Sequence, residues 1–170
     1  MQQKFVVEMH TDEKVEKILR NFLLRNSNIL RLTAVKWIEV SWLILWRRKG
    51  GDNDPLFKKT KERLQKYFLK KIINNKRFDD VVQRKKARYE HYFYKLSANL
   101  RKSLNEETLF WPFPPESSKN FYGFEDSTFY RDGHKLGGVI SHENYVFLYL
   151  TPSEKKQLER LNVKLSKVSD

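Results

Sequence analysis

The segment from Trp111 to Pro115 limits what this chain can fold into, because it divides the sequence into two parts. It reads Trp-Pro-Phe-Pro-Pro, and its three prolines forbid a regular helix there. Residues 108–118 are therefore predicted to form a linker, or a strap that lies across another surface. We expect an N-terminal lobe at residues 1–107 and a smaller lobe at residues 119–170, and the two can also pack as a single domain.

Composition restricts the classes of protein further. The 170 residues include four tryptophans, eight tyrosines and twelve phenylalanines, which supply enough apolar surface for a core. The absence of cysteine excludes disulfides, cysteine nucleophiles and thiolate metal sites. The most apolar stretch, Trp37 to Trp46, contains Glu39 and is about half the length that spans a bilayer. With no apolar leader visible, we expect a soluble, cytoplasmic protein with no membrane partner and no cofactor.

The N-terminal lobe is predicted to open with a strand, a helix and a second strand. Residues Lys4 to Met9 are typical of a short strand, and Thr11 is a suitable cap for an amphipathic helix over Asp12 to Arg25. Residues 29–46 fit a strand but also carry a helical stripe. Their β-branched and aromatic content favours the strand.

Two helices are expected to follow, at residues 56–74 and 78–104. In the first, Phe57, Leu64 and Phe68 recur at spacings that place them on one side of a helix. With residues 74–77 as the connection, the pair would form a helical hairpin. A single longer helix is the alternative.

Positive charge is concentrated in this part of the chain. The net charge is +13, and the stretch from Arg47 to Lys102 holds 19 Lys or Arg against 6 Asp or Glu, whereas the remainder is balanced. Helical spacing gathers the basic residues into two stripes, which the two helices would merge into one surface. The candidate binding residues are Lys59, Arg63, Lys66 and Lys70 on the first helix, and Arg84, Arg88, Lys95 and Lys102 on the second.

This basic helical face predicts a non-catalytic protein that binds the backbone of a nucleic acid through counterion release. Tyr67 and Tyr94 would lie near enough to stack on bases. No helix-turn-helix, zinc-finger or RNP pattern specifies DNA or RNA. Two other interpretations are open: a solvated helix surface, or a protein-interaction module, such as a bacterial or phage inhibitor or immunity-type protein, that binds an acidic protein.

The C-terminal lobe is predicted to be a three-stranded antiparallel meander at residues 126–131, 135–141 and 145–150. Asp132-Gly133 is a tight-turn signal between the first two strands. Gly137-Gly138, inside the second strand, indicates a bulge or a close approach of another backbone. Together with the first lobe, these elements define an α+β fold.

A capped helix and an edge strand are expected to complete this lobe. Thr151-Pro152-Ser153-Glu154 has the cap, the first-turn proline and the glutamate of a helix start, so a helix should run to about Leu161. Val163 to Leu165 could add a short edge strand.

Aromatic residues crowd the region between the two lobes. Their rings would either pack in the core or form an exposed patch for a protein partner, since stiff rings beside prolines lose little entropy on binding. The candidate interaction residues are Trp111, Phe113, Phe121 and Tyr122.

Signals for catalysis are weak. His91 has no second histidine at helical spacing and is expected to be a surface residue of a helix. Ser141-His142-Glu143 resembles a triad in composition, but neighbours along a strand point to opposite faces. Glu125 and Asp126 with His142 would be the site of a metal-dependent hydrolase, the weakest of the three functions considered. We therefore assign no catalytic residue and no metal ligand.

Overall fold

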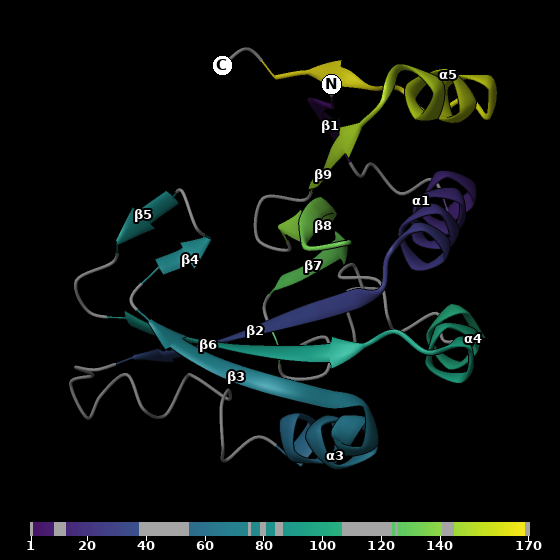
Figure 1. Cartoon of the computed structure of the whole chain (residues 1–170). Coiled ribbons are helices and arrows are strands. Elements are labelled where there is room, and N and C mark those ends of the chain that lie inside the picture. Colours follow the sequence, from purple (N-terminus) through teal and green to yellow (C-terminus); the bar gives the residue numbers. More distant parts are fainter. Residues whose placement is uncertain are drawn as a thin grey trace.

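The computed structural model describes residues 2–8, 13–37, 55–74, 76–78, 81–83, 87–106, 124, 126–140 and 145–168 (Figure 1). The helices are α1 (Glu13–Asn26), α3 (Pro55–Leu64), α4 (Ala98–Glu106) and α5 (Pro152–Arg160), with a 3-10 turn η2 (Gln65–Tyr67) after α3. The strands are β1 (Gln3–Glu8), β2 (Ile29–Trp37), β3 (Phe68–Asn74), β4 (Lys76–Phe78), β5 (Val81–Gln83), β6 (Ala87–Lys95), β7 (Asp126–Arg131), β8 (His134–Ile140), β9 (Tyr145–Leu150) and β10 (Ser166–Lys167).

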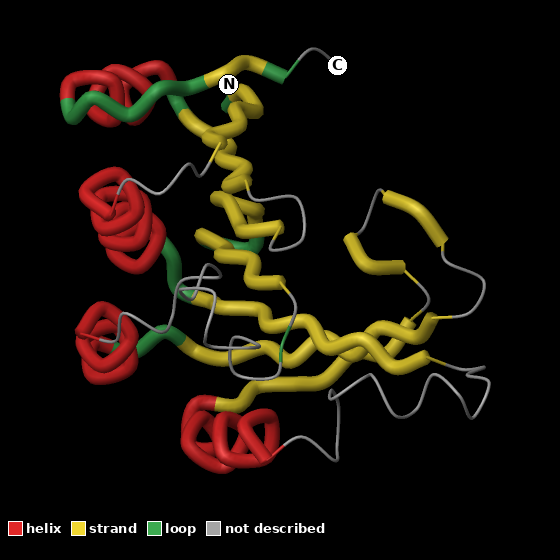
Figure 2. The backbone as a smooth tube through the Cα atoms, turned by 180° about the vertical axis from the view of Figure 1, so that it is seen from behind, coloured by secondary structure: helices red, strands yellow, loops and turns green. Residues whose placement is uncertain are grey.

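Eight of these strands form one twisted sheet in the order β10-β1-β9-β8-β7-β2-β6-β3, with every pairing antiparallel. The helices lie along the same side of this sheet, as Figures 1 and 2 show from opposite directions. The predicted α+β class is therefore confirmed. The opening strand, helix and strand are present as β1, α1 and β2, while residues 38–46 lie outside the described part of the chain.

Strands from both predicted lobes take part in this sheet. β2 pairs with β7, and β1 pairs with β9. Leu30 and Phe129, from β2 and β7, are partners in register and are both fully buried. The sheet therefore continues without a break between segments that lie on either side of residues 108–118.

The predicted helical hairpin at residues 56–74 and 78–104 is wrong. α3 ends at Leu64, and the chain continues as the strand β3, while β6 occupies the middle of the second predicted helix. The β-branched pair Ile72-Ile73 and the aromatic run Tyr89 to Tyr94 favour strands. Cross-strand pairing with β2 then outweighs the helical spacing of the apolar residues.

The core lies between the helices and the sheet. Cross-strand partners share a face of a sheet, so the registers place Phe5, Leu148, Leu30 and Tyr92 on the side that carries the helices. Leu23 of α1 approaches the same side, at the backbone of Gly137. All of these residues are buried.

The C-terminal strands occupy the ranges expected from the sequence. Asp132 (φ 51°) and Gly133 (φ 83°) both have positive φ, as a two-residue hairpin turn requires. The close approach predicted at Gly137-Gly138 is confirmed, since a Cβ on Gly138 would lie 2.4 Å from the Ser127 carbonyl oxygen. The final edge strand is β10 at Ser166–Lys167, a few residues after the expected position.

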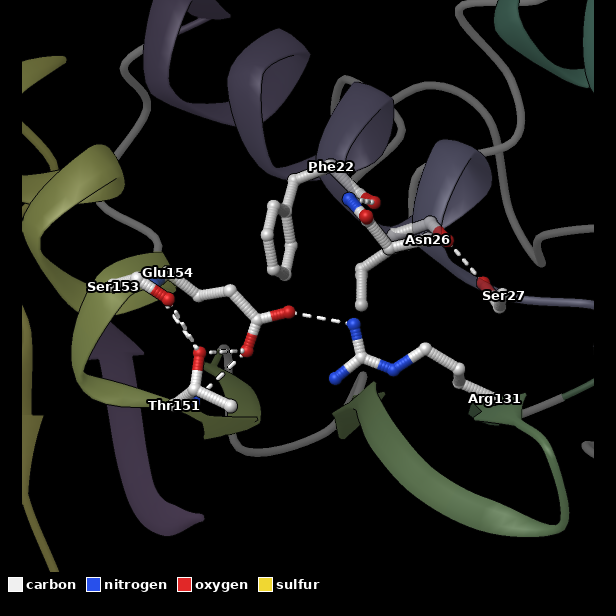
Figure 3. A network of polar contacts seen from close by, with 8 residues as sticks. Phe22, Asn26, Ser27, Arg131, Thr151, Ser153 and Glu154 are labelled. Carbon is white, nitrogen blue, oxygen red and sulfur yellow. Dashed lines mark hydrogen bonds and ion pairs between the residues drawn. The ribbon is translucent and has the colours of Figure 1, made fainter. Parts of the chain in front are cut away.

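The predicted helix start at Thr151 is confirmed. The Thr151 hydroxyl accepts a hydrogen bond from the Glu154 backbone amide, and the Glu154 carboxylate accepts one from the Thr151 amide, 2.8 Å away. Arg131 of β7 donates to the other carboxylate oxygen of Glu154 at 2.6 Å, beside Phe22 and Asn26 of α1 (Figure 3). This network joins the meander to α5 and lies beside the end of α1.

Stability at acidic pH should depend on Glu154. Burial raises the pKa of this carboxyl, but hydrogen bonds from Arg131 and Thr151 lower it more, so the folded pKa is below the usual 4.5. The carboxylate therefore stabilises the fold above pH 4.5, and this contribution is lost as the pH falls through the folded pKa. Urea unfolding of the wild type and of Glu154→Gln should differ at about pH 7, and the difference should shrink as the pH falls below 4.5. A difference that stays constant over this range would contradict the assignment.

Candidate functional site

The strongest concentration of charge lies on α3, η2 and β3, at one end of the sheet. Between Pro55 and Asn74, Glu62 is the one acidic residue among seven basic ones. We call this surface the basic edge, and its charged members are Lys58, Lys59, Lys61, Arg63, Lys66, Lys70 and Lys71. Because β3 is the terminal strand, its residues Lys70 and Lys71 lie on a sheet edge that has no neighbouring strand within the described residues.

Much of this charge faces solvent. Lys58, Lys59, Lys66 and Lys70 are exposed, and none of them forms an ion pair within the described residues. Lys71 forms an ion pair within the protein, since its Nζ lies 2.9 Å from the buried carboxylate of Glu90. These four lysines, which form no ion pair with another described residue, are therefore candidates to contact a partner of opposite charge.

The same edge exposes apolar side chains. Phe68, Leu69, Ile72 and Ile73 are 38–49% exposed, and Leu161 is the one other large hydrophobic residue that is exposed in the described part of the chain. Leu69 sits where the register between β3 and β6 shifts. Concentrated apolar exposure of this kind marks binding surfaces.

Four of the predicted nucleic-acid-binding residues lie on the basic edge, but on three different elements. Lys59 and Arg63 are on α3, Lys66 is in η2 and Lys70 is on β3. All four are exposed, and Arg63 donates a 2.6 Å hydrogen bond to Ser103 of α4. The residues of the first predicted stripe therefore lie on one surface, although they do not belong to a single helix.

The second predicted stripe is not a helical stripe. Arg88 and Lys95 are exposed residues of β6, and their register partners place them on opposite faces of the sheet. Lys102 is exposed on α4. Arg84 lies outside the described residues. The correction follows from the strand geometry, in which side chains seven positions apart cannot share a face.

The rings expected to stack on bases are not available for that role. Tyr94 is 1% exposed, and burial raises its pKa well above the usual 10. Tyr67 is half-buried, with Lys66 Nζ 4.9 Å from its ring centroid. Lys70 similarly covers Phe93 at 5.1 Å. The edge therefore offers lysines, aliphatic groups and one partly exposed ring, that of Phe68.

The prediction that His91 is a surface residue of a helix is wrong. It is a buried residue of β6, with Nδ1 3.0 Å from the Thr33 hydroxyl and Nε2 3.2 Å from Asn74 Oδ1. This hydroxyl, imidazole and amide have the order of a catalytic relay. However, Thr33 is 0% exposed, so no substrate atom can approach its hydroxyl, and the network satisfies buried polar groups instead.

The other candidates for chemistry and binding are largely untested. Glu125, His142 and the aromatic residues Trp111, Phe113, Phe121 and Tyr122 lie outside the described residues. Asp126 is buried in β7, and the described residues contain no cluster of potential metal ligands. Phe124, which follows the aromatic segment, is in the core, with its ring 4.8 Å from that of Phe57.

A cavity of about 220 Å³ lies between α1 and α5, near the network in Figure 3. Its lining is apolar at Ile18, Phe22 and Leu158, and Arg25 is its one charged residue. Without an acidic or histidine side chain, this cavity has no pair of groups for acid–base catalysis.

Sequence reasoning missed the exposed strand at the centre of the basic edge. Lys58, Lys71, Ile72 and Ile73 were not identified as surface candidates, because a helix was expected there. The adjacent β-branched residues Ile72-Ile73 were the available signal for a strand.

Comparison of the chain with protein-family models, with curated proteins and with solved structures finds no match. Among the helices described, none is long and apolar enough to cross a membrane.

Proposed function

We propose that this chain is a non-catalytic binding protein whose basic edge binds an acidic segment of a protein partner. The observation that carries the proposal is the combination of four exposed lysines on α3, η2 and β3, which form no ion pair with another described residue, and exposed aliphatic side chains on the terminal strand β3. The lysines attract carboxylates and guide association, and the aliphatic groups add apolar contact once the partner is bound.

Binding to a nucleic acid backbone by the same lysines is the second candidate. Lys59, Arg63, Lys66 and Lys70 are exposed on consecutive elements, which suits a run of phosphates. Two features favour a protein. The aliphatic residues Ile72 and Ile73 have no counterpart on a phosphate backbone, and of the described rings near them Phe68 alone is among the exposed residues, at 38%.

Charge reversal at the edge tests the proposal. The probe is fluorescent poly-L-glutamate, with duplex DNA and single-stranded RNA measured in parallel at about 50 mM salt. The variant Lys59→Glu/Lys66→Glu/Lys70→Glu should bind poly-L-glutamate about 30- to 100-fold more weakly. Each reversal removes an attraction worth up to about 1 kcal/mol and adds repulsion.

The matched control is Lys17→Glu/Lys156→Glu/Lys164→Glu, which changes the net charge equally at exposed lysines outside the basic edge. We expect this control to lose less than about 3-fold, because exposed charges more than about 10 Å from the ligand are screened. Equal losses in both variants would show that net charge alone attracts the probe. Tight binding of DNA or RNA without binding of poly-L-glutamate would replace the proposal with the nucleic-acid function.

A further inference from the structure

We infer that the partner binds as an added β-strand alongside β3, an inference that rests on the proposed function. β3 is seven residues long and pairs only with β6 among the described strands, so its outer edge presents main-chain donors and acceptors. An edge of this kind can align an extended segment of another chain.

The side chains of β3 indicate what such a strand should contain. The register with β6 places Phe68, Lys71 and Ile73 on the face that carries the helices, and Lys70 and Ile72 on the opposite face. Lys71 already contacts Glu90 at 2.9 Å, whereas Lys70 forms no ion pair in the described chain. The strand should therefore offer a carboxylate beside Lys70 and apolar side chains beside Phe68 and Ile73.

The lysines also determine which strands are excluded. Lysine on an edge strand opposes pairing with uncharged or basic strands, because its charge would be desolvated without a partner. A second copy of this chain would bring the same basic edge, so like charges would meet. An acidic strand would be attracted by the same lysines, so the edge would select acidic partners over uncharged or basic ones.

Alternate acidic and apolar residues would place carboxylates on the face of Lys70 and apolar side chains on the face of Phe68 and Ile73. The probe is a blocked peptide of about eight residues in which Glu and Val alternate, so that one face is acidic and the other apolar. A peptide with the same composition in two blocks, all Glu and then all Val, carries equal charge without the alternation. We expect the alternating peptide to bind at least about 10-fold more tightly, because it alone matches both faces.

Backbone methylation separates strand addition from simple attraction. Two forms of the alternating peptide are needed, one N-methylated at every Glu and one at every Val. Because alternate residues direct their amide groups to opposite edges of a strand, one form blocks the edge that faces β3. We expect one of the two forms to lose at least about 10-fold in affinity, since it loses ladder hydrogen bonds.

The outcomes distinguish the two proposals. If neither methylated form loses affinity, or if the block peptide binds as tightly as the alternating one, strand addition is wrong. The proposed function would still hold in that case if Lys59→Glu/Lys66→Glu/Lys70→Glu abolished binding of every peptide. If no acidic peptide binds the wild type, both proposals fail. Sedimentation of the free protein as a dimer that dissociates on Ile72→Lys would identify a second copy as the occupant instead.

Discussion

Replacing Phe129 with alanine is expected to lower the free energy of unfolding by about 3–5 kcal/mol. Phe129 is 0% exposed, and it lies opposite Leu30 on β2 and Gly137 on β8. Its ring therefore fills the place where the N-terminal and C-terminal strands meet. Removing it leaves a cavity that the flanking strands cannot close, because each is fixed by its own hydrogen-bonded neighbours.

The loss should be measured by urea unfolding, with Phe68→Ala as the matched control. Phe68 is 38% exposed on the outer strand, so the same truncation there should cost only about 1 kcal/mol. The loss of about 3–5 kcal/mol expected for Phe129→Ala is a large fraction of the 5–15 kcal/mol that typically holds a domain together. Equal losses at the two positions would show that Phe129 is not central to the core.

Replacing Gly138 with alanine is expected to destabilise the protein by about 1–3 kcal/mol although it adds one methyl group. The new Cβ would lie 2.4 Å from the Ser127 carbonyl oxygen and 2.7 Å from Cζ of Phe147. The Phe147 ring can move aside, but the carbonyl belongs to β7, the neighbouring strand, and cannot shift without disturbing the sheet. Thermal and urea unfolding would measure the effect.

A double-mutant cycle separates these two contacts. Phe147→Leu removes the ring atoms nearest the new methyl group, so Gly138→Ala should cost less in that background. The contact with the Ser127 carbonyl remains, and a substantial part of the loss should persist. Complete rescue by Phe147→Leu would show that the ring alone requires glycine at this position.

The central part of the chain could not be assigned from the sequence for a geometric reason. Tyr89 and Phe93 are four residues apart, and this spacing places side chains on one face of a helix. Four is also an even number, so the same spacing places residues on one face of a strand. The pattern therefore fits both structures. Pairing of β6 between β2 and β3 is what selects strands here.

The residue types of the candidate site could be predicted from the sequence, but their arrangement in space could not. The concentration of lysine was visible in the sequence, and Lys59, Lys66 and Lys70 are exposed as expected. Their arrangement beside an exposed strand was not visible, because it depends on β3 being the last strand of the sheet. A strand position of this kind is decided by long-range pairing.

The sequence by itself determined the features that depend on adjacent residues. The turn at Asp132-Gly133 needs two residues that tolerate positive φ, and the start of α5 needs the capping set from Thr151 to Glu154. Only the tertiary structure decided that His91 is buried and that β3 is exposed. Both follow from the order of the described strands in the sheet, which brings together residues far apart in the chain and places β3 at one end.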